Sequence, residues 1–240
     1  MKAVIFDCDG VLVDTERDGH RVAFNRAFAA LGIDAAWDVP TYGELLRVSG
    51  GKERMRHYFD QHGWPAGRGE SQDELIAALH KTKTDIFTDI IAGGELPLRP
   101  GIARVVDEAI AAGVRLGVCT TSNAKAIDGV LDLLGPERKA RFEFVHAGDV
   151  VSRKKPDPEI YELAKQSLGL PASDCLVIED SRNGLLAATG AGLPCLITTS
   201  TYTIDEDFAG ALDVVPELGD PPNTAITVDD LGQLASKRAA

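Results

Sequence analysis

The sequence predicts an α/β protein: a doubly wound, Rossmann-like core built on a parallel sheet, with an inserted all-helical cap domain. Two observations predict this class. Short apolar runs alternate with amphipathic helical segments over most of the chain, whereas one interval near the N-terminus shows helical periodicity only. We expect residues 1–14 and 97–240 to form the core domain and residues 15–96 the cap domain, because 240 residues suffice for two unequal domains.

Runs rich in Val, Ile, Leu, Phe and Cys predict the strands of the core. They cover residues 3–7, 114–120, 142–147, 175–179 and 195–199. Helical segments separate most of these runs. We therefore expect right-handed crossovers, parallel strands and helices on both faces of the sheet.

Three helices of the core follow from apolar residues spaced three and four positions apart. The apolar positions are Ile102, Val105, Val106, Ala109 and Ile110 in the first helix, Ile127, Val130, Leu131 and Leu134 in the second, and Ile160, Leu163, Ala164 and Leu168 in the third. Pro100 precedes the first helix, Pro136 follows the second and Gly169 ends the third, which are positions that these residue types favour.

The interval between residues 15 and 98 contains no convincing strand. Its helical stripes are Phe24, Ala27, Phe28 and Leu31, then Met55, Tyr58 and Phe59, and then Leu75, Ile76, Leu79, Ile86, Phe87, Ile90 and Ile91. The insertion is tethered at residues 14–16 and 96–100, and such an insertion is typical of a lid. A helix bundle that packs without moving is the alternative interpretation.

Composition narrows the possible partners and the compartment. The net charge of −12 and the pI of about 4.8 argue against a nucleic-acid or anionic-membrane surface. Cys8, Cys119, Cys175 and Cys195 lie in or beside predicted strands and lack metal-type spacing, so we expect buried, reduced thiols and a reducing compartment. The sequence has no apolar run of transmembrane length, and no signal or transit segment precedes the first strand. We expect either a protein that never had such a segment or a mature or trimmed form of one that did.

Polar residues gather where the predicted strands end. Asp7 and Asp9 follow the first strand, Thr120 ends the second, and Glu179-Asp180 ends the fourth. Thr121, Ser122 and Asn123 continue the second group as candidates for substrate binding, and Lys155 precedes a helix. Each group alone has a structural explanation as a turn, a helix cap or a loop. Together, at the carboxyl edge of a parallel sheet, they indicate one site.

This set of residues suits magnesium-assisted phosphoryl transfer. Clustered carboxylates and phosphate oxygens are the ligands that Mg²⁺ prefers, and Asp7, Asp9 and Asp180 are the best candidates, with Glu179 as a further one. The Lys155 ammonium can balance these charges and hold a phosphoryl oxygen. Thr120 and the amides after it can donate to another oxygen.

The same residues resemble the haloacid dehalogenase superfamily of phosphatases. The resemblance rests on Asp7-Cys8-Asp9-Gly10, Thr120, Lys155 in "KKPDP" and Glu179-Asp180, which occur in the family's order over almost the whole chain. "GGKERM", "LRPGI" and "IEDSRNG" look most like the CbbY-type phosphatases, relatives of β-phosphoglucomutase, and "DTERDGHRVAFN" looks most like their plastid members.

The resemblance implies hydrolysis of xylulose 1,5-bisphosphate, an inhibitory by-product of Rubisco, and a place in the chloroplast stroma, with the cytoplasm as the alternative. It makes Asp7 a nucleophile that forms an aspartyl-phosphate, and Asp9 the general acid and then base. We further expect a monomer whose partner is a small sugar bisphosphate, with no nucleic acid and no membrane.

The cap should bind the sugar. Glu16 and His20 lie on the helical stripe of Phe24, although a helix start with a satisfied histidine is an equal alternative. Gly50, Gly51, Lys52 and Arg54 are candidates for a distal phosphate, or else an ordinary turn. Lys83 lies on an apolar stripe, where it either snorkels or binds substrate.

Other activities remain open. A phosphosugar mutase would use the same four motifs, and phosphoglycolate is another possible substrate. A metal-independent dehalogenase conflicts with Asp9 and the acidic pair. A receiver-type signalling domain also accepts phosphate on an aspartate, but receivers are much shorter and lack the helical insertion.

Overall fold

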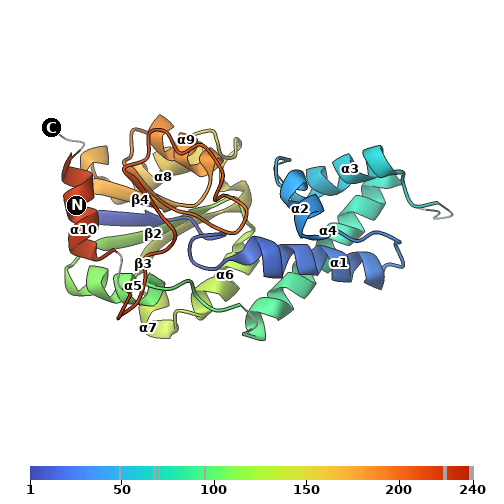
Figure 1. Ribbon diagram of the computed structural model, residues 1–240, viewed down its shortest axis with the longest axis horizontal. Coiled ribbons are helices and arrows are strands. Elements are labelled where there is room, and N and C mark those ends of the chain that lie inside the picture. Colours follow the sequence, from blue (N-terminus) through green and yellow to red (C-terminus); the bar gives the residue numbers. More distant parts are fainter. Residues whose placement is uncertain (49, 67–68, 70, 95, 224–225, 238–240) are drawn as a thin grey trace. The chain divides into compact units, whose positions relative to one another are not determined.

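The structure is a computed structural model that describes residues 1–48, 50–66, 69, 71–94, 96–223 and 226–237. The chain divides into two compact units. Residues Met1–Asp14 and Pro97–Ala240 form one, which we call the core unit, and residues Thr15–Leu96 form the other, the helical unit. Figure 1 shows both units and labels their α-helices and some of the core strands.

The core unit is built on a six-stranded parallel sheet with the strand order β3-β2-β1-β4-β5-β6. The strands are β1 (Ala3–Phe6), β2 (Arg115–Thr120), β3 (Phe142–Ala147), β4 (Cys175–Glu179), β5 (Cys195–Thr198) and β6 (Asp213–Val215). The predicted α/β class with a parallel sheet is confirmed. Strand β6 lies outside the predicted set because three residues are too few to show a pattern.

Helices cover both faces of this sheet, as Figure 1 shows. They are α5 (Ile102–Ala111), α6 (Ala124–Asp132), α7 (Pro136–Lys139), α8 (Glu159–Leu168), α9 (Arg182–Gly190) and α10 (Val228–Lys237). Helices α8 and α9 pack on the face that carries Ile5, Val177 and Ile197. The register pairs Phe6 with Val118 of β2 and with Ile178 of β4, so the central strands end side by side.

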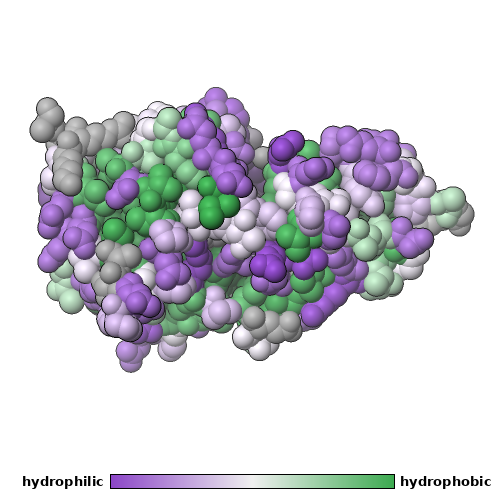
Figure 2. Space-filling model, viewed as in Figure 1, coloured by the Kyte–Doolittle hydropathy of each residue, from purple (hydrophilic) through white to green (hydrophobic). Residues whose placement is uncertain are grey.

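The helical unit is described by itself. It contains a π-helical turn, η1 (Glu16–His20), and the helices α1 (Arg21–Ala30), α2 (Val39–Leu45), α3 (Gly51–His62) and α4 (Gln72–Ala92). Its core is aromatic: Phe24, Phe28, Trp37 and Phe59 are fully buried and in ring contact. Figure 2 shows a hydrophilic outer surface over α3. In the described part of the chain, no helix is both long and apolar enough to cross a membrane.

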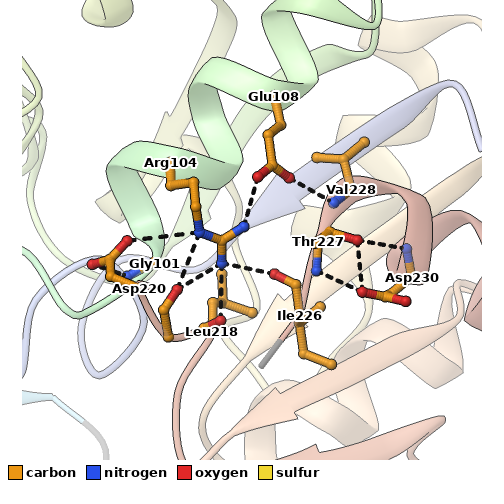
Figure 3. A network of polar contacts seen from close by, with 10 residues as sticks. Gly101, Arg104, Glu108, Leu218, Asp220, Ile226, Thr227, Val228 and Asp230 are labelled. Atoms are coloured by element: carbon orange, nitrogen blue, oxygen red, sulfur yellow. Dashed lines mark hydrogen bonds and ion pairs between the residues drawn. The ribbon is translucent and has the colours of Figure 1, made fainter. Parts of the chain in front are cut away.

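A polar network fastens the C-terminal part of the core unit to α5 (Figure 3). The Arg104 guanidinium donates to the carbonyl oxygens of Leu218 at 3.0 Å and Ile226 at 2.9 Å, and to Glu108 at 2.7 Å. The other carboxylate oxygen of Glu108 accepts from the backbone amide of Val228, at the start of α10. A single arginine thus joins a helix to a segment more than a hundred residues away in the chain.

Candidate active site

Lys155 is the centre of the polar cluster at the carboxyl edge of the sheet. Its Nζ lies 2.7 Å from Oδ1 of Asp7, 2.6 Å from Oε1 of Glu179 and 2.9 Å from the carbonyl oxygen of Cys119. An ammonium has three donors, and these three contacts use all of them. In this arrangement Lys155 therefore holds Asp7, rather than having a donor left for a phosphoryl oxygen as the sequence suggested.

Adjacent strands bring the three acceptors together. Asp7 directly follows β1, Cys119 lies in β2 and Glu179 is the last residue of β4, and β1 lies between β2 and β4 in the sheet. Lys155 comes from the segment before α8, and Glu159, the first residue of α8, accepts hydrogen bonds from the backbone amides of Ser152 and Arg153 in that segment. From this segment the long side chain of Lys155 reaches strand ends that are far away in the sequence.

Glu179 is a fully buried carboxylate with two donors on one oxygen. Oε1 accepts from Lys155 and, at 2.6 Å, from the hydroxyl of Tyr161 on α8. A side chain at position 184 would overlap this carboxylate, so Gly184 makes room for it at the start of α9. Burial, with Glu179 as the next contribution, raises the pKa of Tyr161 well above its usual value, so this hydroxyl remains a donor.

Gly10 makes room for the carboxylate of Asp180, as Gly184 does for that of Glu179. Gly10 has a φ of +84°, a conformation that side-chain-bearing residues rarely adopt, and a Cβ there would overlap the carboxylate of Asp180. The carbonyl oxygen of Gly10 also accepts a hydrogen bond from Arg99. The glycine of the Asp-x-Asp-Gly stretch therefore allows Asp180 to approach the loop that follows β1.

Asp7, Glu179 and Asp180 form a group with the chemistry of a cation site. One carboxylate oxygen from each residue lies within 4.8 Å of those of the other two, and all three residues are buried. Burial raises the pKa of Asp7 to about 8, and Glu179 and Asp9 act in the same direction against Lys155. One ammonium thus faces an excess of buried carboxylates, and a hard, oxygen-binding cation fits this set.

Asp9, which the sequence placed among the metal ligands, lies outside this group. Its carboxylate accepts a hydrogen bond from the hydroxyl of Ser122, in the segment after β2. Thr120 is 1% exposed, and its hydroxyl accepts from the amide of Ser122 at 3.1 Å. Asn123 caps α6 by accepting from Ala126, as its alternative interpretation expected, and Thr121 is exposed.

Cys8 lies between the two aspartates and is fully buried. Burial raises the pKa of this thiol well above its usual value, and Asp9 and Asp7 raise it further. Cys119, Cys175 and Cys195 are also buried, and their thiols are not part of any disulfide bond. The thiol of Cys8 is therefore protonated at neutral pH and is not a nucleophile.

In the helical unit, the structure separates the residues that the sequence grouped. Tyr42 donates its hydroxyl to Glu16, and Arg54 donates to the Tyr42 oxygen at 2.9 Å and to the carbonyl oxygen of Leu45 at 3.1 Å. Arg54 is therefore buried and ties α3 to α2, whereas Lys52 is exposed. Gly50 precedes α3, and Gly51 starts it.

His20 and Lys83 form a second polar pair in that unit. The Nζ of Lys83 lies 2.9 Å from Nδ1 of His20, and Lys83 is only 9% exposed. The ammonium also faces the rings of Phe24 and Phe87. Lys83 thus does not reach into solvent as a snorkelling lysine would. Glu16 and His20 are the first and last residues of the five-residue π-helical turn η1, which is wound more widely than an α-helix.

Residues 1–192 match the sequence model of a family described as haloacid dehalogenase-like hydrolases. The chain belongs to the haloacid dehalogenase-like hydrolases. The match includes every strand-end residue of the cluster around Lys155, from Asp7 to Asp180.

Within the haloacid dehalogenase-like hydrolases, the chain is similar to proteins named CbbY. A CBBY-like protein of Arabidopsis thaliana is 50% identical over 98% of this chain and 75% of the relative. Protein CbbY of Cupriavidus necator is 46% identical over 92% of this chain and 87% of the relative.

Two crystal structures of CbbY from Rhodobacter sphaeroides are similar to this chain, each with a TM-score of 0.83 and 42% sequence identity. Each match covers 92% of this chain and 96% of the CbbY chain. One structure contains phosphate, and the other is an Asp-to-Asn variant in complex with xylulose 1,5-bisphosphate. The chain is thus a CbbY-type phosphatase of the haloacid dehalogenase-like hydrolases.

Three residues that support the site, Tyr161, Glu159 and Arg99, are not indicated by the sequence. Tyr161 lies on the buried stripe of α8, where an aromatic residue is typical of core packing, and Leu163, expected on that stripe, is only half-buried. Glu159 and Arg99 act on backbone groups, and a charged residue in a loop gives no sign of such a contact. Only the folded haloacid dehalogenase-like core brings these groups together.

Proposed function

We propose that this protein is a Mg²⁺-dependent phosphatase that hydrolyses xylulose 1,5-bisphosphate to xylulose 5-phosphate and phosphate. The observation that carries the reaction type is the buried contact of Lys155 with Asp7 beside the Asp7–Glu179–Asp180 group. The substrate is supported by the 42% identical Rhodobacter sphaeroides protein, whose Asp-to-Asn variant was crystallised with that bisphosphate.

Asp7 is proposed as the nucleophile. Lys155 holds Oδ1, which leaves Oδ2 as the oxygen that attacks phosphorus and forms an aspartyl-phosphate. Asp9 gives a proton to the departing sugar oxygen and later takes one from the water that cleaves the acyl phosphate. The Ser122 hydroxyl orients the Asp9 carboxylate, and the buried Thr120 lies beside Ser122.

Mg²⁺, held by Asp7, Asp180 and Glu179, would neutralise charge on the transferring phosphoryl group. Lys155 supports this arrangement by keeping the Asp7 carboxylate in place. Glu179 already accepts hydrogen bonds from Lys155 and Tyr161. The carboxylates of Asp7 and Asp180 would therefore be the more available ligands for Mg²⁺. Asp9 is assigned to proton transfer, which fits its position outside the carboxylate group.

The helical unit is proposed as the cap that binds the sugar and the distal phosphate. The charges that suit this role are the exposed Lys52 beside the Gly50-Gly51 turn and the ammonium of Lys83. Glu16 and His20 are assigned to the sugar hydroxyls, and Thr121 and Asn123 to the substrate at the core unit. Arg54 acts indirectly, since it contacts Tyr42, which holds Glu16.

A substrate panel tests the function. Magnesium-dependent phosphate release is measured side by side from xylulose 1,5-bisphosphate, ribulose 1,5-bisphosphate, phosphoglycolate and β-glucose 1-phosphate. We expect the highest kcat/KM for xylulose 1,5-bisphosphate. Conversion of β-glucose 1-phosphate to an isomer without phosphate release would identify a mutase, and stable autophosphorylation without turnover would indicate a signalling domain.

The Asp7→Asn variant tests the nucleophile. Replacing the attacking oxygen by an amide is expected to lower kcat by at least about a thousandfold, because the covalent step is lost. Near-normal turnover of the true substrate would disprove the mechanism.

The 50% identity to a plant protein supports the chloroplast stroma as the proposed location, and a fluorescent fusion of the full-length gene product checks it.

A further inference from the structure

Tyr161 is a fully buried tyrosine that contacts both partners of the ion pair that holds the nucleophile. Its hydroxyl donates to Oε1 of Glu179 at 2.6 Å, and the Nζ of Lys155 lies 5.0 Å from the centre of its ring. The ring distance is within the range of a cation–π contact. A single side chain on α8 thus touches the carboxylate and the ammonium at the same time.

The hydroxyl of Tyr161 is one of two donors on the same oxygen of Glu179. The other is the ammonium of Lys155, at 2.6 Å. Because Glu179 is 0% exposed, water cannot replace a lost donor without a rearrangement. Gly184 closes another side of the carboxylate, since a Cβ there would overlap it. Tyr161 is therefore one of the groups that hold the Glu179 carboxylate in its orientation.

The orientation of Glu179 in turn determines how Lys155 meets Asp7. The ammonium has three donors, and two of them are occupied by Glu179 and the Cys119 carbonyl oxygen. These two contacts direct the third N–H to Oδ1 of Asp7, at 2.7 Å. A small displacement of Glu179 would turn this N–H away from Asp7.

We propose that Tyr161 is a positioning residue for the nucleophile: it holds Glu179 with its hydroxyl and faces Lys155 with its ring, and so aligns the ammonium with Asp7. The inference rests on the proposed function, because it concerns a reaction that Asp7 performs. Tyr161 has no assigned contact with the substrate. Its effect should therefore appear in the chemical step and not in substrate binding.

Tyr161→Phe is the informative substitution, because it keeps the ring over Lys155 and removes only the hydroxyl. We expect kcat to fall about tenfold while KM stays within about twofold, since one hydrogen bond to a charged group is lost and no substrate contact changes. Tyr58→Phe is the matched control: it removes a hydroxyl from a half-buried tyrosine that packs on Trp37 in the helical unit, and kcat should not change.

A double-variant cycle tests the route of the effect. Glu179→Gln combined with Tyr161→Phe should lower kcat no further than Glu179→Gln alone, because the hydroxyl acts through that carboxylate. Additive losses would overturn the inference. So would a kcat within twofold of wild type together with a lower unfolding midpoint, since that result describes packing alone. A raised KM with unchanged kcat would place Tyr161 in substrate binding instead.

A second readout separates this inference from the proposed function. If the wild-type protein releases no phosphate from any substrate of the panel, the proposed function fails. Magnesium-dependent binding of beryllium fluoride to Asp7, a mimic of the phosphoryl group, is then followed by fluorine NMR. Tyr161→Phe is expected to weaken this binding about tenfold, and equal binding by both proteins would overturn the positioning role.

Discussion

At the scale of single residues, Gly10 has the strictest local requirement of the site. Two independent conditions meet there: a positive φ of +84° and the carboxylate of Asp180 in the space of a side chain. The carbonyl oxygen of Gly10 is also held by Arg99, so the backbone has little freedom to relax. A substitution at Gly10 would therefore affect the acidic group as well as the turn.

Gly10→Ala should lower kcat by at least about a hundredfold and weaken magnesium binding, because the new methyl group displaces Asp180 and strains the backbone. Phosphate release and a magnesium titration measure these effects. Gly113→Ala is the matched control, since Gly113 has a φ of +69° with no atom within 4 Å of a Cβ. Equal activity of the two variants would show that the contact with Asp180 is unimportant.

Lys83→Met tests the proposed role of the buried ammonium in the helical unit. If Lys83 binds the distal phosphate, KM for xylulose 1,5-bisphosphate should rise about tenfold while kcat changes little, because a charge that binds substrate is lost. Lys81→Met is the control, because Lys81 is exposed and pairs with Asp85. An unchanged KM would rule out substrate binding and leave Lys83 as the structural partner of His20.

At the scale of secondary structure elements, α5 depends on Arg104 for its connection to the C-terminal segment (Figure 3). The guanidinium spans carbonyl groups of Leu218, Gly219 and Ile226, which are 114 to 122 residues away in the chain. These charge-assisted hydrogen bonds satisfy backbone groups of an irregular segment. The same function could not be performed by an apolar contact.

Arg104→Met should lower the free energy of unfolding by about 2–4 kcal/mol, because several backbone acceptors lose a charged donor while the apolar stem is kept. Thermal or urea unfolding measures the change. Arg138→Met serves as the comparison, because Arg138 pairs with Asp107 at the surface, where a salt bridge contributes about 0–1 kcal/mol. Similar losses for both variants would contradict the importance of the network.

Element by element, the strength of the hydrophobic pattern decided what could be predicted. The expected strands and the helices α5, α8 and α4 have long apolar stripes, and each lies within a residue or a few residues of the predicted position. Helix α2 contains Pro40 and Gly43, and α9 contains two glycines, so both have weak helical signals. Tertiary packing stabilises these two helices despite their composition.

At the scale of the whole molecule, the acidic character of the chain sets its response to pH. The net charge is −12. Asp107 and Glu143 have lowered pKa values, chiefly because Arg138 and Arg115 donate hydrogen bonds to them. The pKa of Asp230 is lowered chiefly by the side chain of Thr227, and that of Glu159 chiefly by the backbone amide of Ser152.

Acid should destabilise the protein through these groups. A carboxyl whose pKa is lowered by folding contributes stability above its unfolded value, 3.8 for Asp and 4.5 for Glu, and loses it as the pH falls through the folded pKa. The unfolding midpoint should therefore drop between about pH 4.5 and pH 2.5. Circular dichroism during heating measures it.

The Asp7→Asn variant is the appropriate background for this measurement. The pKa of Asp7 is raised to about 8, so its contribution has the opposite sign and falls as the pH rises from 3.8 to about 8. The substitution removes that contribution. A midpoint that stays constant down to pH 2.5 would contradict the prediction.

The sequence by itself determined the α/β class, the helical interval and the residues that collect at the strand ends. Periodicity and strand-end motifs are local properties, so a single chain displays them without its neighbours. Tertiary structure alone decided which hydrogen bonds these residues form. Lys155 donates to Asp7, Glu179 and the carbonyl oxygen of Cys119. The Asp9 carboxylate accepts from Ser122, and the Tyr161 hydroxyl donates to Glu179. Each of these contacts joins residues far apart in the chain, and which donor reaches which acceptor depends on how the strands and helices pack.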